Sequence, residues 1–155
     1  MDKATLLHFR DSVAAGGYIG GADNAAIAAF GEHAMLAQNA TLGREGVDAA
    51  VAFKEALLPG WYWRCGRTTL FDGWAFINRL DPNHCDRLDE ASGQAPTPGK
   101  ALVVAVLNAL IALAEGRLTA QPTSFAMPAQ ALNLHDCHAQ EKAAASRATE
   151  GRTDG

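Results

Sequence analysis

Residues 61–80 read WYWRCGRTTLFDGWAFINRL, and this stretch decides the fold. Its first five residues and its last seven, 74–80, are rich in aromatic and β-branched side chains, which favour strands. Asp72 and Gly73 supply a turn just before the second run. Two strands this close in sequence are joined most simply as an antiparallel pair. We therefore predict a hairpin from Trp61 to Leu80.

Helical patterns precede the hairpin. Asp2 is a good N-cap for a helix over residues 3–15, and Asp23 for a second one over 24–38, which contains Gly31 as a weak point. A third helix is expected over residues 47–58, where apolar side chains gather on one side. Lys54 falls within that apolar stripe, so its side chain is expected to snorkel outward to water.

The strongest helical pattern follows the hairpin. Thr97 is a good N-cap and Pro98 suits the first helical position, and Gly116 ends the pattern. The helix is apolar almost all round, which predicts that it is covered on more than one side. The first two helices or a second copy of the chain could cover it.

These patterns predict an α+β fold in which a small antiparallel sheet packs against helices, with an α-helical N-terminal third. The alternative is a mostly α-helical bundle that carries one hairpin. Residues 81–98 are rich in turn-forming types and are expected to form a loop with at most a short edge element. We expect one domain over residues 1–118, an irregular arm over 119–138 and a flexible tail over 139–155.

Composition limits the classes of function. The chain has 155 residues, 48% of them hydrophobic, and a formal net charge of −4, so it can bury a core but has no general attraction for nucleic acid or anionic membranes. Its longest apolar run, residues 101–114, is shorter than the roughly 20 residues of a membrane span. The start of the chain lacks a signal-peptide core, and three cysteines without a CxxC pair fit a reducing compartment. A cytoplasmic location, in the cytosol of a bacterial host, is therefore expected.

Residues 47–114 resemble a known group. Pro59, Gly60, Trp61 and Trp63 form a "PGWYW" entry into a strand, and the last helix begins TPGKAL at Thr97. This order of helix, strand entry, hairpin and Thr-Pro helix start resembles the uncharacterised phage and prophage proteins of the phage ABA sandwich domain type. The resemblance implies a viral origin and an α–β–α layering, and it carries over no catalytic residues.

The hairpin offers a candidate ligand site. By alternation, Tyr62 and Arg64 share one face of the first strand, whereas Trp61, Trp63 and Cys65 share the other. If helices cover one face, the other could expose aromatic rings beside arginines, an arrangement that holds bases and phosphates. The candidate ligand-binding residues are Tyr62, Arg64, Arg67, Trp74 and Arg79.

Two further sets of residues define alternatives. The apolar helix could assemble a homo-oligomer through Leu102, Val106, Leu107, Leu110 and Leu113. A zinc ion could be held by His84, Cys85, His135, Cys137 and His138, although their tight spacing favours ordinary loop residues. Because no catalytic constellation and no required cofactor emerges, we expect a phage- or prophage-derived accessory protein that acts by binding a host or phage protein. A nucleotide-sequestering protein that uses the hairpin face is the alternative, and a metal-dependent hydrolase is the second.

Overall fold

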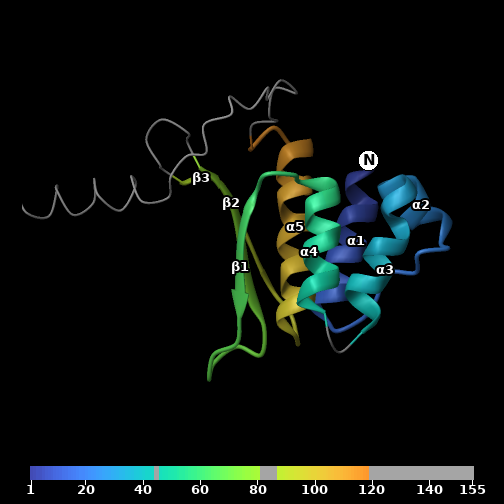
Figure 1. Ribbon diagram of the computed structural model, residues 1–155. Helices are drawn as coiled ribbons and strands as arrows, with labels where there is room; N and C mark the ends of the chain where they lie inside the picture. Colours follow the sequence, from blue (N-terminus) through green and yellow to red (C-terminus); the bar gives the residue numbers. More distant parts are fainter. Residues whose placement is uncertain (44–45, 81–86, 119–155) are drawn as a thin grey trace, which may run out of the picture. The chain divides into compact units, whose positions relative to one another are not determined.

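Three antiparallel strands form one sheet in the order β1-β2-β3 (Figure 1). They are β1 (Tyr62–Gly66), β2 (Trp74–Leu80) and β3 (Arg87–Gln94). The structure is a computed structural model that describes residues 1–43, 46–80 and 87–118, all within one compact unit, Met1–Ala120. The predicted hairpin is confirmed, and the fold is α+β, with the sheet packed against helices.

The third strand corrects the expectation of a loop. β3 is eight residues long and pairs with β2 along its length. The pairing shifts register between Ile77 and Arg79, where Asp89 takes the positive φ of 52° that marks a β-bulge. The sequence of β3 does not predict a strand, because the face that packs against the helices carries small side chains instead of large apolar ones.

The N-terminal helices begin where the caps predict. In α1 (Lys3–Ala14), the Oδ2 of Asp2 accepts a hydrogen bond from the backbone N–H of Thr5 at 2.9 Å. The prediction of a single helix over residues 24–38 is wrong, because Gly31 adopts a φ of 58° and ends the first helix there. It separates α2 (Asn24–Phe30) from a 3₁₀ turn, η1 (Gly31–His33), and from α3 (Ala34–Leu42).

The two remaining helices flank the sheet in sequence. α4 (Val47–Leu57) carries Lys54, whose side chain is fully buried and therefore does not snorkel to water as expected. α5 (Pro98–Ala114) begins at Thr97, whose Oγ1 accepts a hydrogen bond from the N–H of Lys100 at 3.3 Å. Its end is followed by Gly116 at a φ of 67°, as the sequence predicts.

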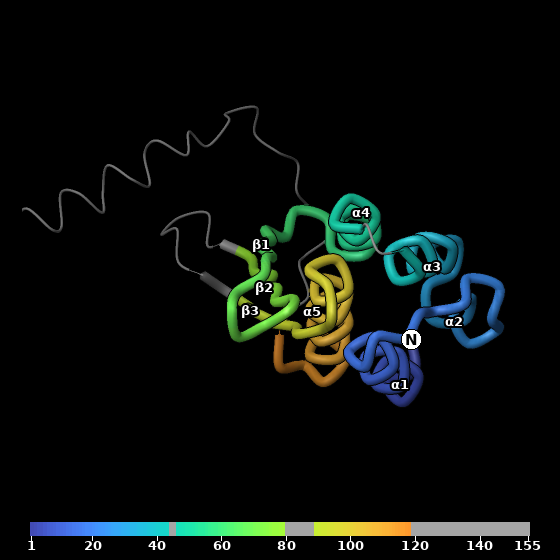
Figure 2. Tube along the Cα trace, turned by 90° about the horizontal axis from the view of Figure 1, so that it is seen from below, coloured from blue at the N-terminus to red at the C-terminus, as the bar shows by residue number. Residues whose placement is uncertain are grey.

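Helix α5 is the centre of this unit. Figure 2 shows the sheet on one side of α5 and the helices α1, α3 and α4 around the rest of it, all of which contact it. Ala75, Ile77 and Gly93 turn from the sheet toward the helices and are buried. A Cβ on Gly93 would lie 2.3 Å from the carbonyl oxygen of Ala101, so the glycine sets how closely β3 approaches α5.

The described helices therefore lie on one face of the sheet. The α–β–α layering implied by the resemblance is not formed by residues 1–43, 46–80 and 87–118, in which no helix covers the second face. Within the same ranges, no helix is long and apolar enough to cross a membrane.

Candidate binding surface

The side of the sheet that no described helix covers, here called the outer face, carries the aromatic residues that the hairpin predicts. Strand register sets Arg64 opposite Phe76 and Gly66 opposite Trp74. Because cross-strand partners point to the same side, these residues share the outer face with Tyr62. The outer face is thus defined by Tyr62, Arg64, Trp74, Phe76 and Glu90.

The aromatic rings form a short row that Arg64 extends. The ring centroids of Trp74 and Phe76 lie 5.8 Å apart. The guanidinium carbon of Arg64 lies 5.0 Å from the centroid of Phe76, within cation–π range. Tyr62 remains 52% exposed, so the row offers apolar area to a partner.

Gly66 makes room for the indole of Trp74. A Cβ at Gly66 would come within 3.0 Å of the Cζ2 atom of Trp74, so the ring lies against the strand backbone. The indole Nε1 is buried and donates to no partner in the described part of the chain. Trp74 therefore acts as a fixed apolar platform, and its polar edge is not presented to a ligand.

The charges of the hairpin are answered by β3. Arg64 Nη2 lies 3.2 Å from Glu90 Oε2, and Arg79 forms an ion pair with Asp89. Both acidic residues fall in the segment 81–98, which is expected from the sequence to be a loop. Two of the three arginines of the hairpin are therefore paired with carboxylates, which weakens the electrostatic attraction that a phosphate would need on this sheet.

The five predicted ligand residues do not form one site. Tyr62, Arg64 and Trp74 share the outer face, and Arg67 is exposed in the loop beyond β1. Arg79 belongs to the opposite face, where its guanidinium carbon lies 5.7 Å from the centroid of the Trp61 ring. The bulge does not change this assignment, because Arg79 alternates with Ile77 on the helix side.

Two residues of the outer face escaped prediction. The alternation already places Phe76 beside Trp74, so that signal was present in the sequence. Glu90 could not be found, because its place depends on the pairing of β3 with β2.

The residues predicted to form an interface belong to the core of the chain itself. Leu102, Val106 and Leu107 are fully buried, and Leu110 and Leu113 are partly buried against the same core. The helices α1, α3 and α4 and the sheet provide this cover. These side chains therefore pack within one copy, and Leu110 and Leu113 keep part of their surface exposed.

The predicted metal ligands all lie outside the described residues; they are His84, Cys85, His135, Cys137 and His138. Within the described ranges, no group of three or more His, Cys, Asp or Glu side chains is arranged to hold a metal ion. The one cysteine described, Cys65, has its thiol pKa raised by burial, which is the opposite of activation.

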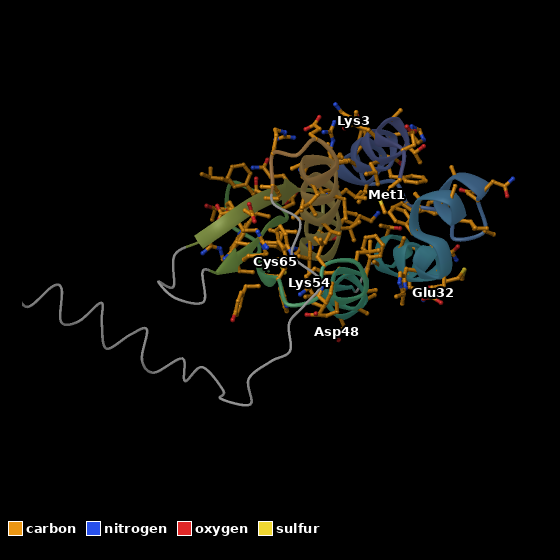
Figure 3. All side chains as sticks on the ribbon, turned by 90° about the horizontal axis from the view of Figure 1, so that it is seen from above. Met1, Lys3, Glu32, Asp48, Lys54 and Cys65 are labelled. Atoms are coloured by element: carbon orange, nitrogen blue, oxygen red, sulfur yellow. The ribbon has the colours of Figure 1, made fainter. Side chains whose placement is uncertain are left out.

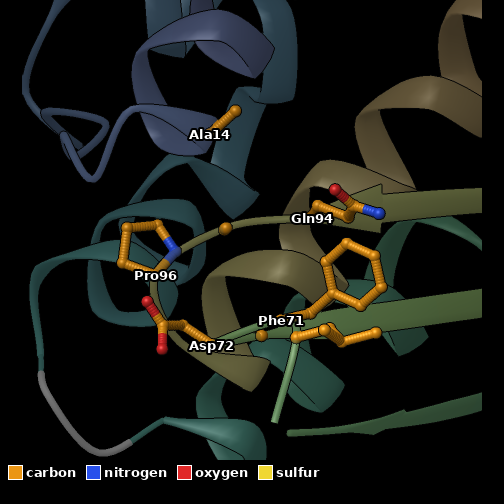
Figure 4. Close-up of a pocket in the computed structure, with 8 residues that line it drawn as sticks. Ala14, Phe71, Asp72, Gln94 and Pro96 are labelled. Atoms are coloured by element: carbon orange, nitrogen blue, oxygen red, sulfur yellow. The ribbon is translucent and has the colours of Figure 1, made fainter. Parts of the chain in front are cut away.

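Shallow hollows flank the sheet at two places. One of about 410 Å³ lies between the hairpin loop and the end of β3, and Figure 4 shows Phe71, Asp72, Gln94 and Pro96 around it. The other, of about 360 Å³, is lined by Glu55, Gly60, Trp61, Tyr62 and Trp63. Both are open, unlike the enclosed pockets in which proteins bury small ligands.

Comparisons with protein-family models, with curated proteins and with solved structures gave no match to this chain. The sequence and the geometry are therefore the basis on which a function can be inferred.

Proposed function

We propose that this chain is a non-catalytic accessory protein of phage or prophage origin that acts in the bacterial cytosol by binding a protein partner. The observation that carries the proposal is the outer face, where Tyr62, Phe76 and Trp74 lie beside a charge-neutralised Arg64. The viral origin rests on the resemblance of residues 47–114 and on nothing else.

The chemistry of the outer face suits a protein better than a nucleotide. Aromatic residues and arginine are enriched in protein interfaces, and they supply most of the residues whose loss weakens binding. A phosphate ligand would have to compete with Glu90 for Arg64, in a chain whose net charge is already −4. A flat, neutral, aromatic surface favours contact with another protein.

A nucleotide-like ligand is the second candidate, because Arg64 stacked on Phe76 beside Trp74 could still hold a base. Titration with a panel of nucleotides would test it through the fluorescence of Trp74. The metal-dependent hydrolase has no such observation in its favour, since its candidate ligands lie outside the described residues.

The main test compares two double variants in a pull-down from bacterial cytosol. The first, Tyr62→Ala with Arg64→Ala, removes the outermost groups of the outer face. The second, Tyr18→Ala with Met35→Ala, removes residues that are 60% and 51% exposed on the helical side, and serves as the matched control.

We expect the wild-type chain and the control to retain the same partner, and the first variant to lose it. Circular dichroism and thermal unfolding would establish that both variants fold. A partner that the first variant retains as well as wild type would contradict binding through the outer face.

A further inference from the structure

Among the described residues, β1 and β3 are the two edge strands of the sheet, and their edges differ. A free edge exposes unpaired backbone N–H and C=O groups that can accept another strand, so natural proteins usually cover or distort it. A free edge that is left unprotected points to a partner strand.

The edge at β3 is protected. The N–H of Ala95 donates to the carbonyl of Gly73 at 3.2 Å, so Gly73 and Ala95 are a hydrogen-bonded pair of the β2–β3 ladder. Because such pairs alternate with non-hydrogen-bonded ones, the backbone N–H and C=O of Ser92 point away from β2, toward the edge. Asn108 of α5 reaches this edge, and its Nδ2 donates to the carbonyl oxygen of Ser92 at 2.8 Å. The bulge at Asp89 distorts the same edge further.

The same alternation shows which groups β1 presents. Phe76 is the β2 partner of Ser92, so its backbone N–H and C=O also point away from β3, and they face β1. Its partner on β1, Arg64, therefore directs its own N–H and C=O to β2. Trp63 and Cys65, which alternate with Arg64, therefore direct their N–H and C=O groups to the free edge. No described residue bonds to these four groups.

Lys54 ends this open stretch at the start of β1. Trp61 has the same alternation as Trp63, and its carbonyl oxygen accepts a hydrogen bond from Lys54 Nζ at 2.5 Å. Figure 3 labels Lys54 on α4 and Cys65 on β1, and the contact with Trp61 is made just before β1 begins. The edge is thus capped at Trp61, whereas no described residue pairs with it at Trp63 and Cys65.

The side chains along the edge indicate the occupant. Trp63 points to the helix side of the sheet, yet it remains 40% exposed, and it lines the hollow of about 360 Å³ with Glu55 and Gly60. Arg67, just beyond β1, is exposed and forms no ion pair with any described residue. The strand that suits this edge would therefore carry an apolar side chain beside Trp63 and an acidic one near Arg67.

We propose that the free edge of β1 binds an extended segment of a partner protein by strand addition, with an apolar residue against Trp63 and an acidic residue near Arg67. This inference rests on the proposed function, because it names the form of the protein partner that the chain binds. The outer face beside β1, with Tyr62 at its border, would contact the rest of that partner.

A second copy of the chain fits the edge poorly. In a two-fold antiparallel pair that sets Trp63 against Cys65 of the second copy, the two Arg64 side chains face one another directly, which is unfavourable. A pair centred on Trp63 sets Cys65 against Trp61, whose carbonyl oxygen is already occupied. A pair centred on Cys65 sets Trp63 against Arg67, which lies beyond the strand.

The test begins with a library of random ten-residue peptides displayed against the full chain. Enriched peptides are synthesised and their affinity is measured by calorimetry. Cys65→Pro removes one outward N–H without removing a bond to β2, so it should fold, since proline is tolerated on a free edge. We expect it to weaken binding about tenfold or more, because it removes a hydrogen bond and adds a steric block.

Two further measurements do not depend on a variant that folds. Peptides methylated on alternate backbone nitrogens should lose binding in one alternation and keep it in the other, because a strand pairs through every second residue. Amide hydrogen exchange should be fast at Trp63 and Cys65 in the free chain and slow when peptide is bound. Arg64, which bonds to β2, should be protected in both states.

The outcomes separate the inference from the function on which it rests. Peptide binding that is lost on Tyr62→Ala with Arg64→Ala, but not on Cys65→Pro or on either alternation of methylation, would overturn strand addition and keep protein binding. A dimer in native mass spectrometry that Cys65→Pro dissociates would assign the edge to a second copy instead. No enriched peptide, together with no partner in the pull-down, would overturn both.

Discussion

Lys54 shows how one side chain determines the geometry of a strand entry. Its stem crosses the apolar side of α4, and its ammonium group donates to the carbonyl of Trp61 at 2.5 Å and pairs with Glu55 at 2.6 Å. Sequence patterning favoured an exposed ammonium because a buried lysine is rare. The turn at Gly60, which brings Trp61 back onto α4, supplies the partner that makes burial tolerable.

Replacing Lys54 by methionine should keep the packing of the stem and remove the donor to Trp61. Because a buried carbonyl is then left unsatisfied, we expect the free energy of unfolding to fall by about 1–3 kcal/mol. Urea denaturation followed by tryptophan fluorescence measures this. Glu55→Gln is the matched control, and it should change stability by less, since Glu55 is half exposed.

The Cys65 thiol should react slowly. Burial raises its pKa, so the reactive thiolate is scarcer at pH 8 than it is for a free cysteine. We expect iodoacetamide to alkylate Cys65 more slowly in the folded chain than in the urea-unfolded chain, and the rate to increase as the pH rises. Peptide mass spectrometry measures the alkylated fraction. Equal rates in the folded and unfolded chain would contradict the shift.

The same shift has a consequence for stability with a definite sign. Below the pKa of the unfolded chain, the thiol is protonated in both states, so it does not change the free energy of unfolding with pH. Above that pH the thiol ionises in the unfolded chain but not yet in the folded one, so the free energy of unfolding falls as the pH rises toward the folded pKa. The loss should be absent in Cys65→Ser.

At the scale of elements, β3 was the strand that sequence patterning missed. Its residues, RLDEASGQ, lack the aromatic and β-branched types that mark β1 and β2. β3 is nevertheless a strand because β2 offers an edge to pair with and because α5 packs against its small side chains. Element type here is decided by a neighbour and not by local propensity.

Gly93 is the position at which that packing is tightest. A Cβ there would lie 2.3 Å from the carbonyl oxygen of Ala101 and 2.5 Å from the backbone nitrogen of Ala105, both on α5. We therefore expect Gly93→Ala to lower the free energy of unfolding by about 3 kcal/mol, at the upper end of overpacking effects.

Thermal and urea unfolding of Gly93→Ala and of Ser92→Ala would check this. Ser92 is exposed on the same strand, so its substitution should cost little. Similar stability in the two variants would show that α5 and β3 can separate without penalty.

At the scale of the whole molecule, α5 is the element around which the rest assembles. It contacts all three strands and α1, α3 and α4, which explains why it is apolar on nearly every side. The polar exceptions have partners of their own: Lys100 Nζ donates to the carbonyl of Gly16 at 2.5 Å, and Asn108 caps Ser92. The apolar surface of α5 is therefore mostly buried within one copy of the chain.

Leu107→Ala distinguishes a core position from an interface position. Leu107 is fully buried, so truncation should leave a cavity and lower the free energy of unfolding by about 2–5 kcal/mol. Leu110→Ala should cost less, because Leu110 is only partly buried. If Leu107→Ala instead kept full stability and changed the mass of the native assembly, the residue would belong to an interface between copies.

The sequence by itself determined the features that depend on neighbours along the chain. Asp2 and Thr97 mark helix starts, Gly116 marks an end, and the run from Trp61 to Leu80 forms a hairpin, because caps and turns are local chemistry. Phe76 and Trp74 could likewise be placed together by strand alternation alone.

Only the tertiary structure decided the features that depend on distant partners. It made residues 87–94 a strand, gave Arg64 its Glu90 and Arg79 its Asp89, buried Lys54, and covered α5 with the chain's own helices. Pairing across a sheet and packing between layers join residues far apart in sequence, and no local pattern encodes which of the available partners they will meet. For that reason the aromatic hairpin could be predicted from the sequence, whereas the carboxylates that pair with its arginines and the edge of β1 that no described residue pairs with could not.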